Sequence, residues 1–174
     1  MRWIALGFVL VAFHAHTAAA ADGTYTVDGG TTDERAQVHL ALRASQFDWS
    51  ILPPVLVHIV RGGIVSHATP GEIVLDADLL DAGRFSWGVV QHEFAHEVDF
   101  LLLDDADRAR LAALLGGGAW WQGTYDEFAS TLAWAYWPTA DNVMDPIAAP
   151  AAFRALIARL LQTSIQQIQS DFVI

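Results

Sequence analysis

The sequence feature that most constrains the fold is the stretch 86–103, which contains His-Glu-x-x-His as His92, Glu93 and His96. On a helix, His92 and His96 lie one turn apart on the same face, where two imidazoles can share one Zn²⁺. Glu93 is one step further round, so its carboxylate can reach a metal-bound water and act as a general base. An apolar residue also recurs at every fourth position, which is typical of an amphipathic helix with a buried stripe. This stripe consists of Val90, Phe94, Val98 and Leu102.

The first twenty residues have the pattern of an export signal. Arg2 is followed by an apolar run over 3–13 and by small residues at 18–21, as signal peptidase requires. The apolar run is too short to cross a bilayer, which needs about 20 residues. We therefore expect a signal peptide at 1–20, a flexible mature N-terminus at 21–30 and a single domain at 31–174. The mature protein is then secreted, with no stable membrane insertion after signal removal.

Charge and cysteine content exclude several functions. The formal net charge is −11, and Arg is the only strongly basic residue because the chain has no Lys. Nucleic-acid binding needs clustered basic side chains, so a nucleic-acid partner is not expected. The chain also has no Cys, which excludes thiolate zinc ligands and cysteine nucleophiles. A peptide or protein substrate remains the expected partner, and we expect the chain to be a monomer.

Periodicity and breaker residues predict a mostly helical α+β domain. Two short β-rich segments, 55–60 and 72–76, indicate a small sheet packed on the metal-binding helix. His58 and His67 lie in or near these strands, but neither has a partner at ligand spacing, so no metal is expected at them. The tail at 163–174 is ambiguous. Further helices are predicted at 32–45, at 105–115, from 124 to a stop near Pro138, and at 151–161.

Two histidines leave a catalytic zinc ion one protein ligand short. A carboxylate from a later helix is a common third ligand, and the helix after Gly123 offers Asp126 and Glu127. If Thr124 is the N-cap of that helix, Glu127 becomes its capping-box partner, which would leave Asp126 for the metal. The residues alone leave both carboxylates open.

The motif residues resemble those of gluzincin metallopeptidases, and among these the lethal-factor-like catalytic domains. The resemblance covers His92-Glu-Phe-x-His96-x-Val98-Asp99 and the later Glu127-Phe stretch. It implies a zincin-like fold with one Zn²⁺ per chain and a Glu ligand on the downstream helix. On residue type it favours Glu127 as the third ligand, with Asp126 as the alternative, because Asp is one methylene shorter.

Other residues near the motif have more open roles. The resemblance and the helical spacing both suggest a second-shell role for Asp99, in which it accepts a hydrogen bond from a ligand imidazole. A solvated acid at the end of the helix is the alternative. Glu97 has no such placement and is expected to be a surface charge. Tyr125 and Tyr136 are candidates for the donor that stabilises the transition state. Core packing is the expected use of the tryptophan cluster, which consists of Trp120, Trp121, Trp134 and Trp137.

Taken together, the residues predict a secreted zinc-dependent peptidase, with an endopeptidase expected rather than an exopeptidase. Glu93 is its general base, and His92 and His96 are its first two metal ligands. The alternative is a secreted zinc-binding domain without turnover, whose site serves binding or interaction. Both functions use the same ligands, so the sequence does not separate them.

Overall fold

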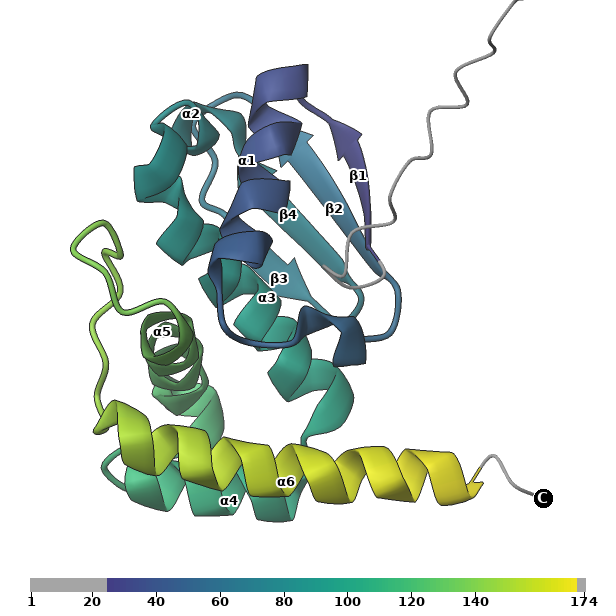
Figure 1. Cartoon of the computed structure of the whole chain (residues 1–174), viewed down its shortest axis with the longest axis vertical. Helices are drawn as coiled ribbons and strands as arrows, with labels where there is room; N and C mark the ends of the chain where they lie inside the picture. Colours follow the sequence, from purple (N-terminus) through teal and green to yellow (C-terminus); the bar gives the residue numbers. More distant parts are fainter. Residues whose placement is uncertain (1–24, 172–174) are drawn as a thin grey trace, which may run out of the picture.

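The computed structural model describes residues 25–171, so the predicted signal peptide lies outside the described residues. The described chain is a mixed α+β structure with a small sheet on one side and a group of helices on the other (Figure 1). The helices are α1 (Thr32–Ala44), α2 (Ala77–Leu80), α3 (Trp87–Leu102), α4 (Asp105–Leu114), α5 (Thr124–Tyr136) and α6 (Pro150–Asp171). The strands are β1 (Tyr25–Gly29), β2 (Val55–Val60), β3 (His67–Thr69) and β4 (Glu72–Asp76). Short 3₁₀ turns are η1 (Trp49–Ile51), η2 (Gly83–Ser86) and η3 (Trp120–Gln122).

The sheet has four strands in the order β1-β2-β4-β3. The two predicted strands, 55–60 and 72–76, are confirmed as β2 and β4, which pair in parallel at the centre. The edge strand β3 pairs antiparallel to β4. The expectation of a flexible segment at 21–30 is wrong for 25–29, which form the other edge strand. In β1, Tyr25 and Val27 pack against the core while Thr26 and Asp28 are exposed, so its alternating pattern serves a half-buried strand.

The predicted helices are also confirmed, and their ends follow local capping. Thr31 and Glu34 form the capping box of α1, and Asp104 caps α4 by accepting from the backbone of Asp107. After α4 the chain turns at Gly116, which has a positive φ of 108°, a conformation that glycine adopts without steric cost. The last helix is longer than predicted, because α6 continues through the ambiguous tail as far as Asp171.

The helix with the His-Glu-x-x-His motif, α3, lies between two layers. It packs against α5 on one side and against α1 and β3 on the other. The predicted apolar stripe of α3 is buried along its whole length, from Val90 to Leu102. Glu97 is also completely buried, so the expectation of a surface charge is wrong. Its Oε2 accepts a hydrogen bond of 2.8 Å from the backbone N–H of Gly71, which joins α3 to the turn between β3 and β4.

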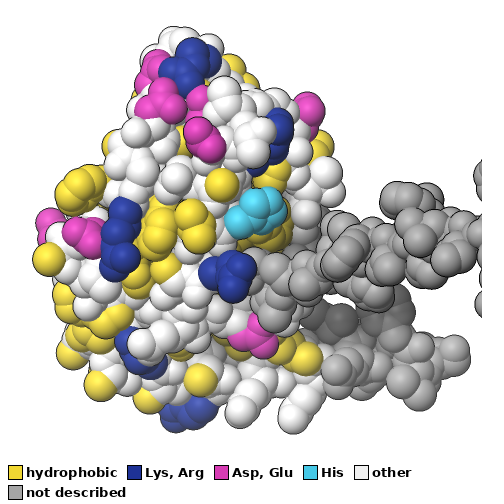
Figure 2. All heavy atoms as spheres, turned by 45° about the horizontal axis from the view of Figure 1, so that its top comes forward, with side chains coloured by type: hydrophobic (Ala, Val, Ile, Leu, Met, Phe, Trp, Pro, Cys, Tyr) yellow, Lys and Arg dark blue, Asp and Glu magenta, His cyan; other side chains and the backbone are white. Residues whose placement is uncertain are grey.

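Among residues 25–171, no helix is both long enough and apolar enough to cross a membrane. Figure 2 shows one face of the molecule, on which the Arg side chains are scattered among acidic and hydrophobic ones instead of forming one basic patch.

Candidate metal centre

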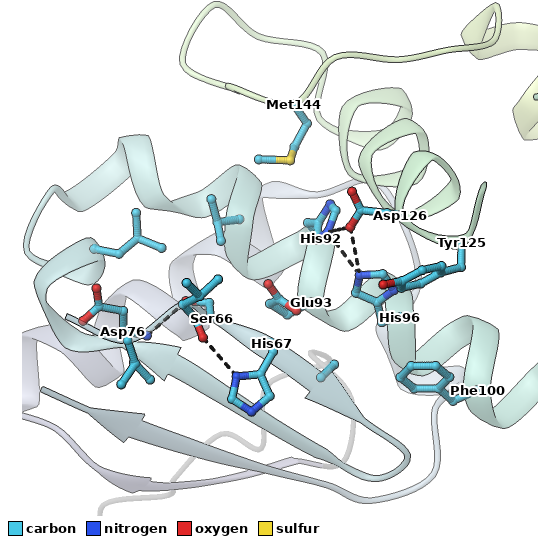
Figure 3. A pocket seen from close by; sticks show the side chains of 15 residues that line it. Ser66, His67, Asp76, His92, Glu93, His96, Phe100, Tyr125, Asp126 and Met144 are labelled. Atoms are coloured by element: carbon cyan, nitrogen blue, oxygen red, sulfur yellow. Dashed lines mark hydrogen bonds and ion pairs between the residues drawn. The ribbon is translucent and has the colours of Figure 1, made fainter. Parts of the chain in front are cut away.

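The two motif histidines lie on the same face of α3, as their spacing predicts. Their Nε2 atoms are 3.1 Å apart, and both rings line a cleft of about 570 Å³ between β3, α3 and α5 (Figure 3). His96 is buried, and burial lowers its pKa to about 4. Its imidazole is therefore neutral at neutral pH, which is the state that binds a metal ion.

Asp126, in the first turn of α5, brings a carboxylate to the two imidazoles. Its Oδ1 is 3.2 Å from His92 Nε2 and 3.7 Å from His96 Nε2. The hydrogen bond to His92 lowers the pKa of this carboxyl group, which keeps it ionised. His92, His96 and Asp126 are the described residues that form a group able to hold a metal ion.

The separations within this group fit a tetrahedral zinc ion. Zinc bonds to imidazole nitrogen and carboxylate oxygen are about 2.0–2.2 Å long, which sets tetrahedral ligand atoms about 3.4 Å apart. The three observed separations, 3.1, 3.2 and 3.7 Å, lie close to that value. The donor set of two nitrogens and one oxygen also matches catalytic zinc sites, which have three protein ligands.

The preferred third ligand from the sequence, Glu127, is not part of this group. Successive helical residues are rotated by about 100°, so on α5 the face toward α3 carries Asp126 and, one turn later, Ser130. The carboxylate beside the two histidines is therefore that of Asp126, the alternative ligand, and not that of Glu127, which was preferred on residue type. Glu127 is not a capping-box partner either, because the N-cap of α5 is Gly123 and not Thr124. The shorter Asp suffices because α3 and α5 pack closely.

Ser130 supports the site from the same face of α5. Its Oγ lies 3.1 Å from His92 Nδ1. When Nδ1 donates its proton to that oxygen, the lone pair of Nε2 is left to face Asp126 and the metal position. The sequence reasoning did not assign this role to Ser130, although the i, i+4 spacing from Asp126 is a signal that could have found it.

Asp99 does not have the predicted second-shell role. It is completely buried, but its carboxylate accepts hydrogen bonds from Arg108 Nε at 2.7 Å and Trp120 Nε1 at 2.9 Å. Nδ1 of His96, one of the two ligand imidazoles, is buried with no hydrogen-bond partner among the described residues. Asp99 lies on the side of α3 that faces α4 and η3, so it joins these elements and not a ligand imidazole.

Glu93 lies beside the three possible ligands without being one of them. It lines the cleft and is only 5% exposed. Loss of hydration raises its pKa to about 7, and the neighbouring imidazoles partly offset this increase. A carboxyl group with a pKa near neutrality can both accept and release a proton at physiological pH, which is the requirement for a general acid–base group.

The two candidate tyrosines occupy different places. Tyr125 lines the cleft, and its ring centre is 5.3 Å from that of His96 (Figure 3). Tyr136 instead packs against Phe47 and Arg154, outside the cleft lining. Only Tyr125 is therefore placed to contact a molecule bound in the cleft.

The two histidines that the sequence places in or near the strands, His58 and His67, belong to the sheet. His67 lines the cleft from β3, and its Nδ1 is 3.0 Å from the carbonyl oxygen of Val65. His58 lies on β2 between Asp28 and Glu72 and does not line the cleft. Neither histidine belongs to the metal-binding group of the described residues.

No known protein family, curated protein or solved structure matches this chain. The likeness to gluzincins thus remains a resemblance of short motifs. The functional interpretation of the site depends on the residues in the cleft and on their distances.

Proposed function

We propose that this chain is a zinc-dependent peptidase that hydrolyses peptide bonds. His92, His96 and Asp126 are the proposed metal ligands, and Glu93 is the proposed general base. The observation that carries the proposal is the placement of a buried carboxyl group with a pKa of about 7 beside three metal-binding atoms in an open cleft. A site that served only to hold a metal ion would need neither that carboxyl group nor the cleft.

Each residue has a defined task in this reaction. Zinc bound at the site would act as a Lewis acid that polarises the substrate carbonyl and lowers the pKa of a water to about 7. The Glu93 carboxylate accepts a proton from the attacking water and then donates it to the nitrogen of the leaving amine. Ser130 fixes the orientation of His92 through Nδ1. The hydroxyl group of Tyr125 can donate a hydrogen bond to the carbonyl oxygen as negative charge develops on it.

The proposal includes action outside the cell, supported by the export-signal pattern at 1–20, and cleavage within peptide chains. The alternative function, zinc binding without turnover that serves binding or interaction, uses the same ligands but needs no general base at Glu93.

The test is digestion of casein and of gelatin by the purified mature protein. We expect digestion that stops when a chelator removes the metal and resumes when zinc is added back. Elemental analysis of the same samples gives the zinc content at each step. Bound zinc without digestion of casein or gelatin would contradict the peptidase and support the domain without turnover.

A further inference from the structure

An aromatic column leads from the metal centre to the surface. The ring of Phe100, one turn after His96 on α3, stacks on the imidazole at 5.9 Å and 17°. Trp121 stacks on Phe100 at 6.4 Å and 14°. Tyr125 closes the side of the column, 6.0 Å from Trp121 and 5.3 Å from His96. Phe100 and Tyr125 both line the cleft, as Figure 3 shows, so the column continues the wall of the site.

The outer ring of the column is exposed to solvent. Of the predicted tryptophan core, Trp120 and Trp137 are indeed buried, but Trp121 is 59% exposed. Large apolar side chains that stay exposed at the edge of a polar site are typical of binding surfaces. Because Trp121 contacts Phe100 and Tyr125, which line the cleft, its exposed part adjoins the place where a substrate would bind.

An ion pair between Arg108 and the completely buried Asp99 supports the position of Trp121. The Arg108 guanidinium lies over the Trp121 ring, with Cζ 5.1 Å from the ring centre. Arg108 is held by Asp99, through Oδ1 at 2.7 Å and through the backbone carbonyl oxygen at 2.9 Å. The same carboxylate binds Trp120 Nε1 at 2.9 Å. Asp99 thus positions both tryptophans of η3, which is a role that its complete burial supports.

We infer that Phe100, Trp121 and Tyr125 form a subsite for a bulky aromatic side chain of the substrate. This inference deepens the proposed peptidase function and rests on it. Flat rings stack favourably on other aromatic rings, with a gain beyond their buried area. A basic side chain would gain less, because the Arg108 guanidinium already lies over the Trp121 ring and occupies its cation–π contact.

The column also sets the range of positions at which the aromatic side chain is recognised. The rings step outward from His96 by 5.9 Å to Phe100 and by a further 6.4 Å to Trp121. An extended peptide rises about 3.3 Å per residue. The recognised side chain is therefore expected within about three residues of the bond that is cut.

The test uses a series of peptides that differ in one residue, which is Phe, Leu, Arg or Ala, at each of the three positions on either side of the cleaved bond. We expect kcat/KM at one position to be about 10- to 100-fold higher for Phe than for Ala. Arg should be no better than Ala. Trp121→Ala and Trp121→Leu should each lower the Phe-to-Ala ratio, by about tenfold for Ala.

Phe85→Ala is the matched control. Phe85 is also 59% exposed, but it lies in η2 and does not line the cleft. Its replacement should leave the Phe-to-Ala ratio of kcat/KM unchanged. The inference is overturned if the wild type shows no preference for Phe, or if the Trp121 variants keep the wild-type ratio.

A binding measurement separates this inference from the peptidase function. Calorimetry of the same peptides with the zinc-loaded Glu93→Gln chain reports affinity without turnover. Tighter binding of Phe than of Ala peptides that depends on Trp121 supports the subsite, even if the wild type cuts none of them and the peptidase proposal fails. Equal affinities for Phe and Ala peptides overturn the subsite, whether or not the wild type cleaves.

Discussion

Glu93 and Glu97 lie one turn apart on α3 but belong to two different regions of the molecule. Both are buried, and loss of hydration raises the pKa of each to about 7. Glu93 faces the cleft beside His92, His96 and Asp126, whereas Glu97 faces the turn between β3 and β4, where it binds the backbone of Gly71. Burial and a raised pKa therefore do not identify a catalytic carboxyl group, and its neighbours and access to the cleft decide its role.

The largest difference between the two glutamates is expected in turnover. Glu93→Gln should lower kcat by about 10²–10⁴-fold, the usual contribution of a general base, while zinc stays bound. Glu97→Gln should change kcat by less than about tenfold, because an amide oxygen can still accept from Gly71. Peptide hydrolysis by both variants at equal zinc content measures this contrast. Equal losses in the two variants would break the distinction between the regions.

The next largest effect on kcat is expected at Tyr125, which lines the cleft, and not at Tyr136, which lies outside it. Tyr125→Phe should lower kcat by about 10²-fold, as removal of a transition-state donor does, with little change in KM. Tyr136→Phe is its control, since Tyr136 packs against Phe47 away from the cleft. A normal kcat in Tyr125→Phe would remove this hydroxyl group from the mechanism.

Replacement of Glu97 should instead change the free energy of unfolding and its dependence on pH. In the folded chain the pKa of Glu97 is about 7, against an ordinary value of 4.5. Between these values the folded state binds more protons than the unfolded state, so the free energy of unfolding falls as pH rises. Glu97→Gln removes this loss, so the variant should gain on the order of 3 kcal/mol relative to wild type from pH 4.5 to 7.5.

Urea unfolding of the zinc-free proteins at several pH values measures this difference. His96, whose pKa is lowered to about 4 by burial, contributes a trend of opposite sign, but it is present in both proteins and cancels. A difference that does not change with pH would mean that Glu97 is not a desolvated carboxyl group.

The smallest expected effect concerns the support of the cleft region by α5. Ser130→Ala removes the partner of His92 Nδ1, so zinc affinity should fall by about 10- to 100-fold, as is usual for outer-shell partners. Competition with a chelator of known affinity measures this change. Thr163→Ala, a control on the exposed side of α6, should leave zinc affinity unaltered.

Local patterns in the sequence were sufficient to predict much of this fold. The capping box of α1, the breaker residues around β2 and β4 and the apolar repeat of α3 each depend on neighbours close in the chain. The strand β1 was missed because its alternation covers only five residues, and it forms a strand through its pairing with β2, a contact distant in sequence. The burial of Glu97 was missed for a similar reason, since its partner Gly71 belongs to another element.

In the candidate site, likewise, the residues on a single helix could be predicted, whereas those that depend on packing between helices could not. His92, Glu93 and His96 follow from spacing on one helix. The third ligand depends on how α5 is rotated about its axis against α3, and adjacent residues differ by about 100° in that rotation. A choice between Asp126 and Glu127 from residue type alone carries no information on this rotation. The role of Asp99 likewise depends on where α4 and η3 pack.

The central claim is that His92, His96 and Asp126 hold one zinc ion. Elemental analysis after gel filtration tests it most directly in the wild type, Asp126→Ala and the matched control Glu127→Ala. The account predicts one zinc per chain in the wild type and Glu127→Ala, and a value near zero in Asp126→Ala. Zinc absent from the wild type, or retained by Asp126→Ala and lost by Glu127→Ala, would contradict it.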